Sequence, residues 1–390
     1  MNRGNQPNEG NEGSRGGANL PALRGHNEAL LLDLLRGTGP AGLGRTELAA
    51  RTGLTPQAVS KITVRLVADG LVAEAGRGAS TGGKPRTLLR LVPEARHAIG
   101  VHLDRDELRA VRVDLAGGVV ERFRGPVDFG AGPGAAVAET ARVIGRLSGD
   151  AGAPPLLGVG VAAPGPLDWR TGVFGPVTGF PAWEGFALRS ALAQRLGPDL
   201  PVVVDKDTNA GVAVAGADPG GAVYLHVGTG LGAGLRLAGE VYRGARSAAG
   251  EFGHQVLELD GPRCRCGGRG CVEALCLGAV DRGDLVEAAR ILGEGAANVV
   301  ALLDVERVLL GGRVVEAAPE VFLAGVRAAL AGRKALPAPV VAVAAGGVAE
   351  GAAELVLGVF FGRGLGRWAP SGSAVESGGA MLGRGRRGEG

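Results

Sequence analysis

The stretch EFGHQVLELDGPRCRCGGRGCVE, residues 251–273, brings together four side chains that bind metal ions in many proteins. One imidazole and three thiolates form the tetrahedral ligand set that Zn²⁺ prefers, and neighbouring glycines let the backbone turn closely around an ion. A site with four protein ligands has no open coordination position, so its metal is structural rather than catalytic. The predicted ligands of one zinc ion per chain are His254, Cys264, Cys266 and Cys271.

Two observations bear on the alternative, in which these are ordinary buried cysteines. Structural cysteines seldom gather in a polar, glycine-rich loop, whereas Cys276 lies in an apolar run and is predicted to be a core residue.

The chain has only four cysteines, three of them close together, and this pattern indicates a protein of a reducing compartment. The first 17 residues contain no apolar segment of a secretory signal, and prolines and glutamates interrupt the apolar region 335–361, which predicts a strand followed by a helix. We therefore expect a cytoplasmic protein without membrane contact.

Composition limits the class of protein further. A chain of 390 residues predicts two or three domains. Aromatic residues make up only 4% of it, which disfavours proteins that stack single-stranded bases, and its 72 glycines follow no collagen-like period. The net charge of +3 is uneven: residues 1–91 carry 12 basic and 7 acidic residues, hence +5, and the remainder carries −2. A basic leading segment predicts a head that binds nucleic acid.

The segment ELAARTGLTPQAVSKI, residues 47–62, has the spacing of a helix-turn-helix. Ala49 is small enough for two helices to cross, Gly53 permits the turn, and Val59 anchors the second helix. We predict helices over residues 26–36, over 45–52, and from Pro56 to about 69 with Thr55 as the cap. Strands near 71–74 and 87–91 would flank a glycine-rich wing.

The third of these helices has a polar face that suits DNA. Val59, Ile62 and Leu66 form the expected buried stripe, and polar side chains flank or oppose it. Such side chains contact base edges and phosphates of double-stranded operator DNA. The alternative is a winged helix used only for protein contacts. The predicted DNA-binding residues are Thr55, Gln57, Ser60, Lys61, Arg65, Arg77, Lys84 and Arg86.

From about residue 97 the pattern becomes α/β. Three consecutive strands (98–104, 108–115 and 118–124) precede a helix over 135–147 and a strand over 156–163, and a second set begins with strands near 202–204 and 222–227. This order occurs in two-lobed sugar kinases and actin-like ATPases. The predicted division is a disordered tail (1–19), a winged helix-turn-helix (20–91), a two-lobed actin/hexokinase-like (ribonuclease H-like) domain (96–361) and a Gly/Arg-rich tail (362–390).

Together these motifs resemble the ROK family (repressors, open reading frames and kinases). CxCGxxGCxE preceded by EFGH is similar to the family signature, and VAAPGPLD (161–168) and VGTGLGAGL (227–235) are similar to two further family motifs. The attached helix-turn-helix, with GGKPR closing its wing, resembles the sugar-operon repressors of the xylose-repressor type. The resemblance covers about residues 20–361.

The resemblance implies a sugar site. Family kinases bind the sugar with an Asn-Asp pair whose aspartate is the general base, and Lys206 and Asp207 occupy those positions here. Glu251, His254 and Glu273 match residues that contact sugar hydroxyls. Lys206 departs from the family pattern, because an ammonium donates but cannot accept; we expect it to pair with Asp207 or Asp205.

A second departure concerns phosphate binding. ROK kinases have a Gly-Gly-Thr turn after the first strand, whereas LDRDELRA (103–110) keeps Asp104 but has Asp106, Glu107 and Leu108 in place of the glycines and hydroxyl. We expect the added carboxylates to repel ATP phosphates and Asp207 to be a vestigial base. Only a remnant of the phosphate loop would survive, at Gly228, Thr229 and Gly230.

The sequence therefore predicts a non-catalytic, sugar-responsive regulator, most simply the repressor of a carbohydrate-utilisation operon. It would bind DNA as a homodimer or a dimer of dimers, and a sugar or sugar phosphate would be its effector. One rival is an active ATP-dependent sugar kinase with an attached DNA-binding head. The other is a DNA-binding protein that senses no ligand and uses its second domain only for zinc-stabilised dimerisation.

Overall fold

The computed structural model describes residues 20–77, 86–150, 152–216, 220–333 and 338–363. These residues form two compact units. The N-terminal unit extends to Pro93 and includes Phe360–Gly362, and the second unit begins at Glu94. The tail predicted at residues 1–19 lies outside the described residues, as does the tail predicted at 362–390 except for Gly362 and Arg363.

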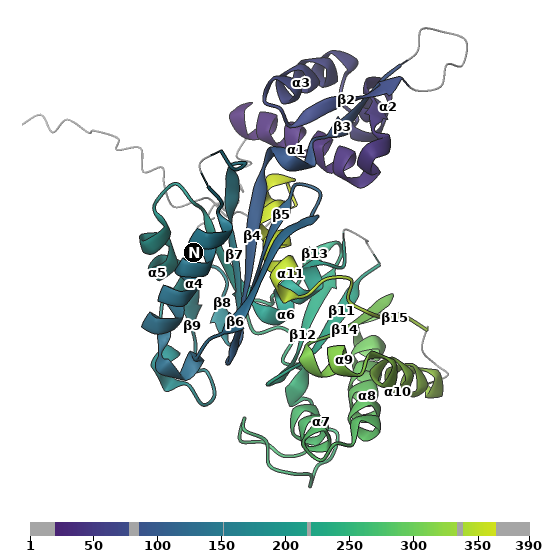
Figure 1. Ribbon diagram of the computed structural model, residues 1–390. Helices are drawn as coiled ribbons and strands as arrows, with labels where there is room; N and C mark the ends of the chain where they lie inside the picture. The colour runs from purple at the N-terminus through teal and green to yellow at the C-terminus, as the bar shows by residue number, and fades with distance from the viewer. Residues whose placement is uncertain (1–19, 78–85, 151, 217–219, 334–337, 364–390) are drawn as a thin grey trace, which may run out of the picture. The chain divides into compact units, whose positions relative to one another are not determined.

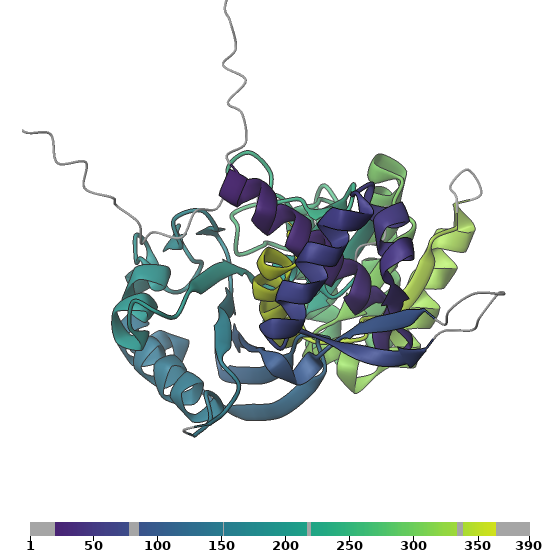
Figure 2. The ribbon, with the colours of Figure 1, turned by 90° about the horizontal axis from the view of Figure 1, so that it is seen from above.

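The N-terminal unit combines three helices with a small antiparallel sheet. Its helices are α1 (Leu20–Thr38), α2 (Arg45–Thr52) and α3 (Pro56–Ala68), and its strands are β1 (Leu43–Gly44), β2 (Val72–Arg77) and β3 (Thr87–Leu91) in the order β1-β3-β2. The helices gather on one side of the β2–β3 ribbon (Figure 2). Leu35, Leu48, Val59 and Leu89 are fully buried and form the centre of its core.

The turn between α2 and α3 has the features that the sequence predicts. Gly53 adopts a left-handed conformation with φ of 70°, and its N–H donates to the carbonyl of Ala49 at 3.0 Å. The Thr55 hydroxyl accepts from the backbone N–H of Ala58, which caps α3. The predicted bounds of α2 are correct, but α1 begins six residues earlier than predicted, at Leu20.

The first lobe of the second unit is a five-stranded sheet in the order β10-β7-β4-β5-β6. Strands β4, β7 and β10 are parallel, and β5 is antiparallel to both of its neighbours, β4 and β6. Helices α4 and α5 cover one face (Figure 1). The elements are β4 (His97–Leu103), β5 (Glu107–Asp114), β6 (Val119–Pro126), α4 (Pro133–Leu147), β7 (Leu156–Ala163), β8 (Leu167–Asp168), β9 (Val173–Phe174), α5 (Leu188–Leu196) and β10 (Val202–Lys206).

The second lobe is a five-stranded sheet in the order β13-β12-β11-β14-β15. Helices α7, α8 and α10 pack on it around a core of valine, leucine and alanine. The elements are β11 (Ala222–Val227), β12 (Leu231–Leu237), β13 (Glu240–Val241), α7 (Val272–Asp281), α8 (Leu285–Leu303), β14 (Arg307–Gly311), α9 (Arg313–Ala317), α10 (Pro319–Gly332) and β15 (Val340–Val343). Short 3₁₀ helices occur at Gly39–Ala41, Pro93–Ala95, Phe129–Ala131, Pro181–Trp183 and Phe252–His254.

Two helices, α6 (Asp207–Ala213) and α11 (Val348–Phe360), connect the lobes. They cross closely, because a Cβ on Gly351 would lie 1.8 Å from the carbonyl oxygen of Ala210. A Cβ on Gly160 of β7 would meet α11, and one on Gly234 of β12 would meet α6, each at 1.9 Å from a backbone oxygen. The glycines therefore let both helices lie directly on the sheets, and α6 begins where β10 ends, at the cavity described below.

The predicted strand and helix in the apolar region near the C-terminus are confirmed as β15 and α11. Among the described residues, none of the helices combines the length and apolar character needed to cross a bilayer.

Candidate metal centre and ligand cavity

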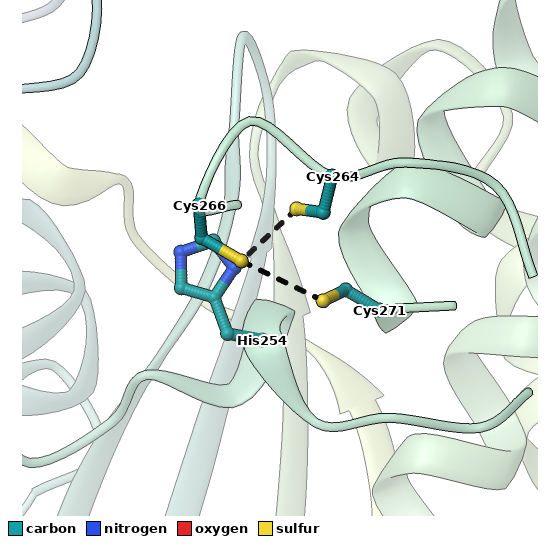
Figure 3. Close-up of side chains that lie close together, drawn as sticks. All are labelled: His254, Cys264, Cys266 and Cys271. Atoms are coloured by element: carbon teal, nitrogen blue, oxygen red, sulfur yellow. Dashed lines mark hydrogen bonds between the residues drawn. The ribbon is translucent and has the colours of Figure 1, made fainter. Parts of the chain in front are cut away.

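The four predicted metal ligands converge in one loop of the second lobe. His254 ends a 3₁₀ turn, Cys264 and Cys266 lie in the following loop, and Cys271 caps the start of α7 (Figure 3). Their ligand atoms all lie within 4.8 Å of one another. The structure describes no other such group of histidine, cysteine, aspartate or glutamate side chains in the ranges it covers.

The spacing of these atoms fits a small tetrahedral ion. Cys266 Sγ lies 3.7 Å from Cys271 Sγ, and Cys264 Sγ lies 3.7 Å from His254 Nδ1. A tetrahedron with Zn–S bonds of about 2.3 Å and a Zn–N bond of about 2.0 Å has edges of about 3.8 Å and 3.5 Å. The cluster is therefore compatible with structural zinc. Cys276 lies outside it, buried in α7, and its thiol donates to the carbonyl of Ala288 at 3.5 Å.

The same histidine connects the metal centre to a cavity. Its Nδ1 faces the thiols, whereas its Nε2 lies 4.0 Å from a carboxylate oxygen of Glu251. Metal-bound histidines commonly use their second nitrogen in this way, which fixes the orientation of the ring. A metal at this centre would thus hold one wall of the cavity in place.

The cavity has a volume of about 140 Å³ and is lined by residues of both lobes. All five predicted sugar-binding residues line it, namely Lys206, Asp207, Glu251, His254 and Glu273. Thr229 and Gly230 of the predicted phosphate-loop remnant line it too, whereas Gly228 does not. Segments that are far apart in the sequence therefore form one site.

The partner of Lys206 differs from the expectation. Its Nζ donates to Glu251 Oε1 at 3.0 Å and to the carbonyl of Ala249 at 2.9 Å, and not to Asp205 or Asp207. Asp205 is instead fully buried and accepts from the Arg243 guanidinium at 2.7 Å and from the Asn209 amide at 2.8 Å. A buried carboxylate needs such partners, so Arg243 takes the role that we assigned to the lysine.

The remaining carboxylates of the inner cavity are held in different ways. Asp207 accepts from the backbone N–H of Thr208, and burial raises the pKa of its carboxyl group above the usual value. Glu273 accepts from the backbone N–H of Leu231 at 3.0 Å. The site therefore offers carboxylate oxygens and an ammonium at fixed positions, an arrangement that suits a polyhydroxylated ligand.

Residues 134–280 match the family model described as the ROK family. These residues form a ROK family domain. As a label, we call the unit from Glu94 to Val359 that contains them the ROK domain.

Known proteins with similar sequences or folds include repressors and kinases. The chain is 28% identical over 256 residues to the xylose repressor of Bacillus subtilis, an alignment that covers 63% of this chain and 64% of the repressor, less than two thirds of its length. A solved ROK family transcriptional regulator, a homologue of the Escherichia coli MLC protein, matches 87% of this chain and 97% of its own with a TM-score of 0.69 at 21% identity, which shows the fold. The ROK hexokinase of Thermus thermophilus matches 69% of this chain and all of its own, with a TM-score of 0.57 at 27% identity.

The β4–β5 turn of the ROK domain differs from the expected picture of repelling charges. Asp104 and Asp106 both accept from Arg313, at 3.0 Å and 2.8 Å, and Glu107 accepts from Arg109 and Arg124. The prediction that unpaired carboxylates of this turn repel phosphates is therefore wrong, because arginine side chains neutralise them. Leu108 is buried in the core of the first lobe. The turn nevertheless contains neither a glycine nor a hydroxyl side chain, and its two aspartates form hydrogen bonds with Arg313.

Three arginines of this region were not predicted from the sequence. Arg313 follows Gly311 and Gly312 at the end of β14, and Arg105 and Arg265 line the cavity from the two lobes. A glycine pair after a strand is a signal that could have indicated Arg313. Arg265 lies between Cys264 and Cys266. The sequence therefore already places it in the loop that forms one wall of the cavity.

The predicted DNA-binding residues lie in the N-terminal unit. Thr55, Gln57, Ser60, Lys61 and Arg86 are exposed, and Val59, Ile62 and Leu66 are buried as predicted. Arg65 is half-buried, flanks the buried face of α3 and forms an ion pair with Glu28 of α1. Arg77 ends β2, and Lys84 lies outside the described residues.

Proposed function

We propose that this chain is a sugar-responsive DNA-binding transcriptional regulator, the repressor of a carbohydrate-utilisation operon. The observation that carries the proposal is the exposed polar face of α3 on a compact N-terminal unit joined to a ROK domain. Similarity to the Bacillus xylose repressor supports it, since that protein is named for the same role. The basic charge of residues 1–91 supports it independently.

The N-terminal unit would act as a winged helix. In helix-turn-helix proteins the second helix lies in the major groove and contacts bases with its N-terminal residues, a position that Gln57, Ser60 and Lys61 occupy on α3. Arg86, and with it Arg77 and Lys84, would contact the DNA backbone. A dimer would then bind two half-sites separated by about one helical turn or a multiple of it.

The ROK domain would carry the sensor. A sugar or sugar phosphate bound between the lobes would favour one arrangement of the lobes over another, and it changes DNA binding only as far as its affinity for the two arrangements differs. His254, Cys264, Cys266 and Cys271 would hold one zinc ion, which supplies structural stability rather than chemistry. Zinc would thereby fix the loop that forms one wall of the cavity.

The kinase alternative draws support from the similarity to the Thermus hexokinase and from the presence of Asp207 in the cavity. The β4–β5 turn opposes it, because phosphate-binding turns need close backbone approach and free N–H groups. The ligand-blind alternative draws support from Lys206, which is buried and paired with Glu251. We favour the regulator over both alternatives, because the chain has a cavity with polar walls that could bind a sugar, while the adjacent β4–β5 turn lacks the features of a phosphate-binding turn.

Binding to DNA from the region upstream of the protein's own gene tests the proposal. We expect the full chain to prefer one such fragment over random duplex of equal length. Gln57→Ala should weaken binding to that fragment by about 1–3 kcal/mol and leave random duplex nearly unaffected, because a base contact matters only at the operator. Val67→Ala, an exposed substitution near the other end of α3, is the matched control. Equal binding of the wild type to all fragments would refute the regulator.

A further inference from the structure

The sugar cavity opens into a wider hollow whose walls carry two arginines. This outer hollow has a volume of about 480 Å³ and is lined by Arg105, Thr178, Gly179, Phe180, Thr229 and Arg265. Four of these residues also line the inner cavity, so the two spaces adjoin. Pockets for small ligands are typically about 300–1,000 Å³, and the inner cavity of about 140 Å³ is smaller than this range. A ligand that fills the inner cavity therefore has room to extend toward the arginines.

Neither guanidinium is neutralised by a carboxylate. Within the described ranges, Arg265 makes no hydrogen bond or ion pair, and the Arg105 guanidinium contacts only the ring of Phe180, at 5.5 Å from its centroid. Nearby carboxylates are already engaged: Asp104 by Arg313 and Thr229, and Glu251 by Lys206. Two positive charges thus face one hollow without a counter-charge from the protein.

The two arginines come from different lobes. Arg105 lies in the β4–β5 turn of the first lobe, and Arg265 lies between Cys264 and Cys266 in the second. Like charges that face the same hollow repel each other, whereas an anion between them attracts both. Guanidinium groups bind phosphate and carboxylate through paired hydrogen bonds, so one anionic group can contact both arginines.

We propose that the effector is an anionic sugar whose phosphate or carboxylate group binds between Arg105 and Arg265. This inference rests on the proposed function, because a ligand is an effector only if the chain is a regulator. It narrows the class of ligand from sugars in general to negatively charged sugar derivatives. The sugar ring lies in the inner cavity against Lys206, Asp207 and Glu251, and the anion lies in the outer hollow. Because the anion contacts both lobes, its binding favours the arrangement in which they are close together.

Thermal unfolding of the zinc-loaded full chain tests this proposal without DNA, so its failure and that of the regulator proposal are distinguishable. The probes are neutral monosaccharides (glucose, xylose, mannose, N-acetylglucosamine), their terminal phosphates, glucuronate and xylonate, and inorganic phosphate, all at matched ionic strength. A ligand of the native state raises the unfolding temperature. We expect at least one anionic sugar to do so more than its neutral parent, and the phosphate and carboxylate series to show which anion is used.

Variants assign the effect to the arginines. Arg105→Gln and Arg265→Gln should each weaken binding of the anionic sugar at least tenfold and remove stabilisation by inorganic phosphate. Arg265→Lys keeps the charge but not the paired donors, and should recover part of the affinity. Arg269→Gln is the matched control, because Arg269 is exposed in the same loop and donates to the carbonyl of Gly261, away from the hollow. Zinc content shows that each variant keeps the loop.

Several results would overturn the proposal. One is a neutral sugar that binds as tightly as its own anionic derivative. Another is an Arg265→Gln variant that responds to every probe as Arg269→Gln does. A third is the absence of any arginine-dependent stabilisation, by the sugars or by inorganic phosphate.

Discussion

His102 is a buried histidine whose charged form the folded chain disfavours. It lies in β4 with its ring edge toward His226, at 5.9 Å between centroids, and its Nε2 has no hydrogen-bond partner within the described residues. Burial lowers the pKa of His102 to about 3, and only in part does Asp104 oppose this shift. In the unfolded chain its pKa returns to about 6.5. The unfolded state therefore binds more protons than the folded state between these two values.

This difference gives a pH-dependent stability. As pH falls below about 6.5, the free energy of unfolding should decrease by up to about 1.4 kcal/mol per pH unit from this group alone. His102→Gln removes the titration, so the stability of the variant should fall less between pH 7.5 and 5 than that of the wild type. Urea unfolding at both pH values measures the change. Equal losses of stability in the wild type and in His102→Gln would contradict the assignment.

At the scale of residues, the sequence identified which side chains meet but not how they pair. The five residues that we expected to bind sugar line one cavity, although they come from a strand end, a loop, a 3₁₀ turn and two helices. The partners of Lys206 and Asp205 could not be predicted, because Glu251 and Arg243 reach them from loops about 40 positions away. Ion pairs between loops depend on tertiary positions that local spacing does not contain.

At the scale of elements, the loop from His254 to Cys271 would depend most on the proposed zinc ion. Cys266 is exposed, so its substitution removes little core packing, and a loss of stability would report the lost ligand. Structural zinc is worth on the order of 10 kcal/mol in small peptides, so Cys266→Ser should lose its zinc and destabilise the second lobe severely. Metal analysis and thermal unfolding measure both effects.

Cys276 supplies the control for the zinc prediction. Its thiol is buried between α7 and α8, so Cys276→Ala changes core packing while leaving the four ligands intact. This variant should keep one zinc per chain whatever its stability. Purified wild-type protein without zinc, or equal zinc loss in both variants, would refute the assigned ligands.

The β4–β5 turn predicts the absence of kinase turnover. The Arg313 side chain binds both aspartates of the turn, and the turn has no glycine through which the backbone could approach a phosphate. We expect no sugar-dependent ATP consumption in a coupled assay with common hexoses and N-acetylated hexosamines. Turnover above background that disappears in Asp207→Asn would contradict this expectation, since we matched Asp207 to the general base of the kinases by resemblance alone.

Elements were predicted well where their pattern is strong. The predicted bounds of α2, β7 and β11 agree with the structure. The start of α1 was missed although Pro21, in its first turn, is a residue that favours helix beginnings. The two-residue strand β1 was missed because it forms only through pairing with β3, which lies more than 40 positions away.

At the scale of the whole molecule, charge is divided between its two units. Residues 1–91 carry a net +5 and the rest of the chain −2. Affinity for the DNA backbone should therefore come from the N-terminal unit, while the ROK domain adds none. Composition alone indicated this division, whereas the facing arginines of the two lobes became apparent only in the folded chain.

Salt dependence tests this division of charge. Each phosphate contact that is lost should reduce the slope of log affinity against log salt concentration by about 0.9. We therefore expect Lys84→Ala and Arg86→Ala each to weaken binding to every duplex and to reduce the slope by about this amount. Arg195→Ala removes the same charge from an exposed position at the end of α5, and it should leave the slope unchanged. If Arg195→Ala reduces the slope as much as Lys84→Ala or Arg86→Ala does, DNA binding is not confined to the N-terminal unit.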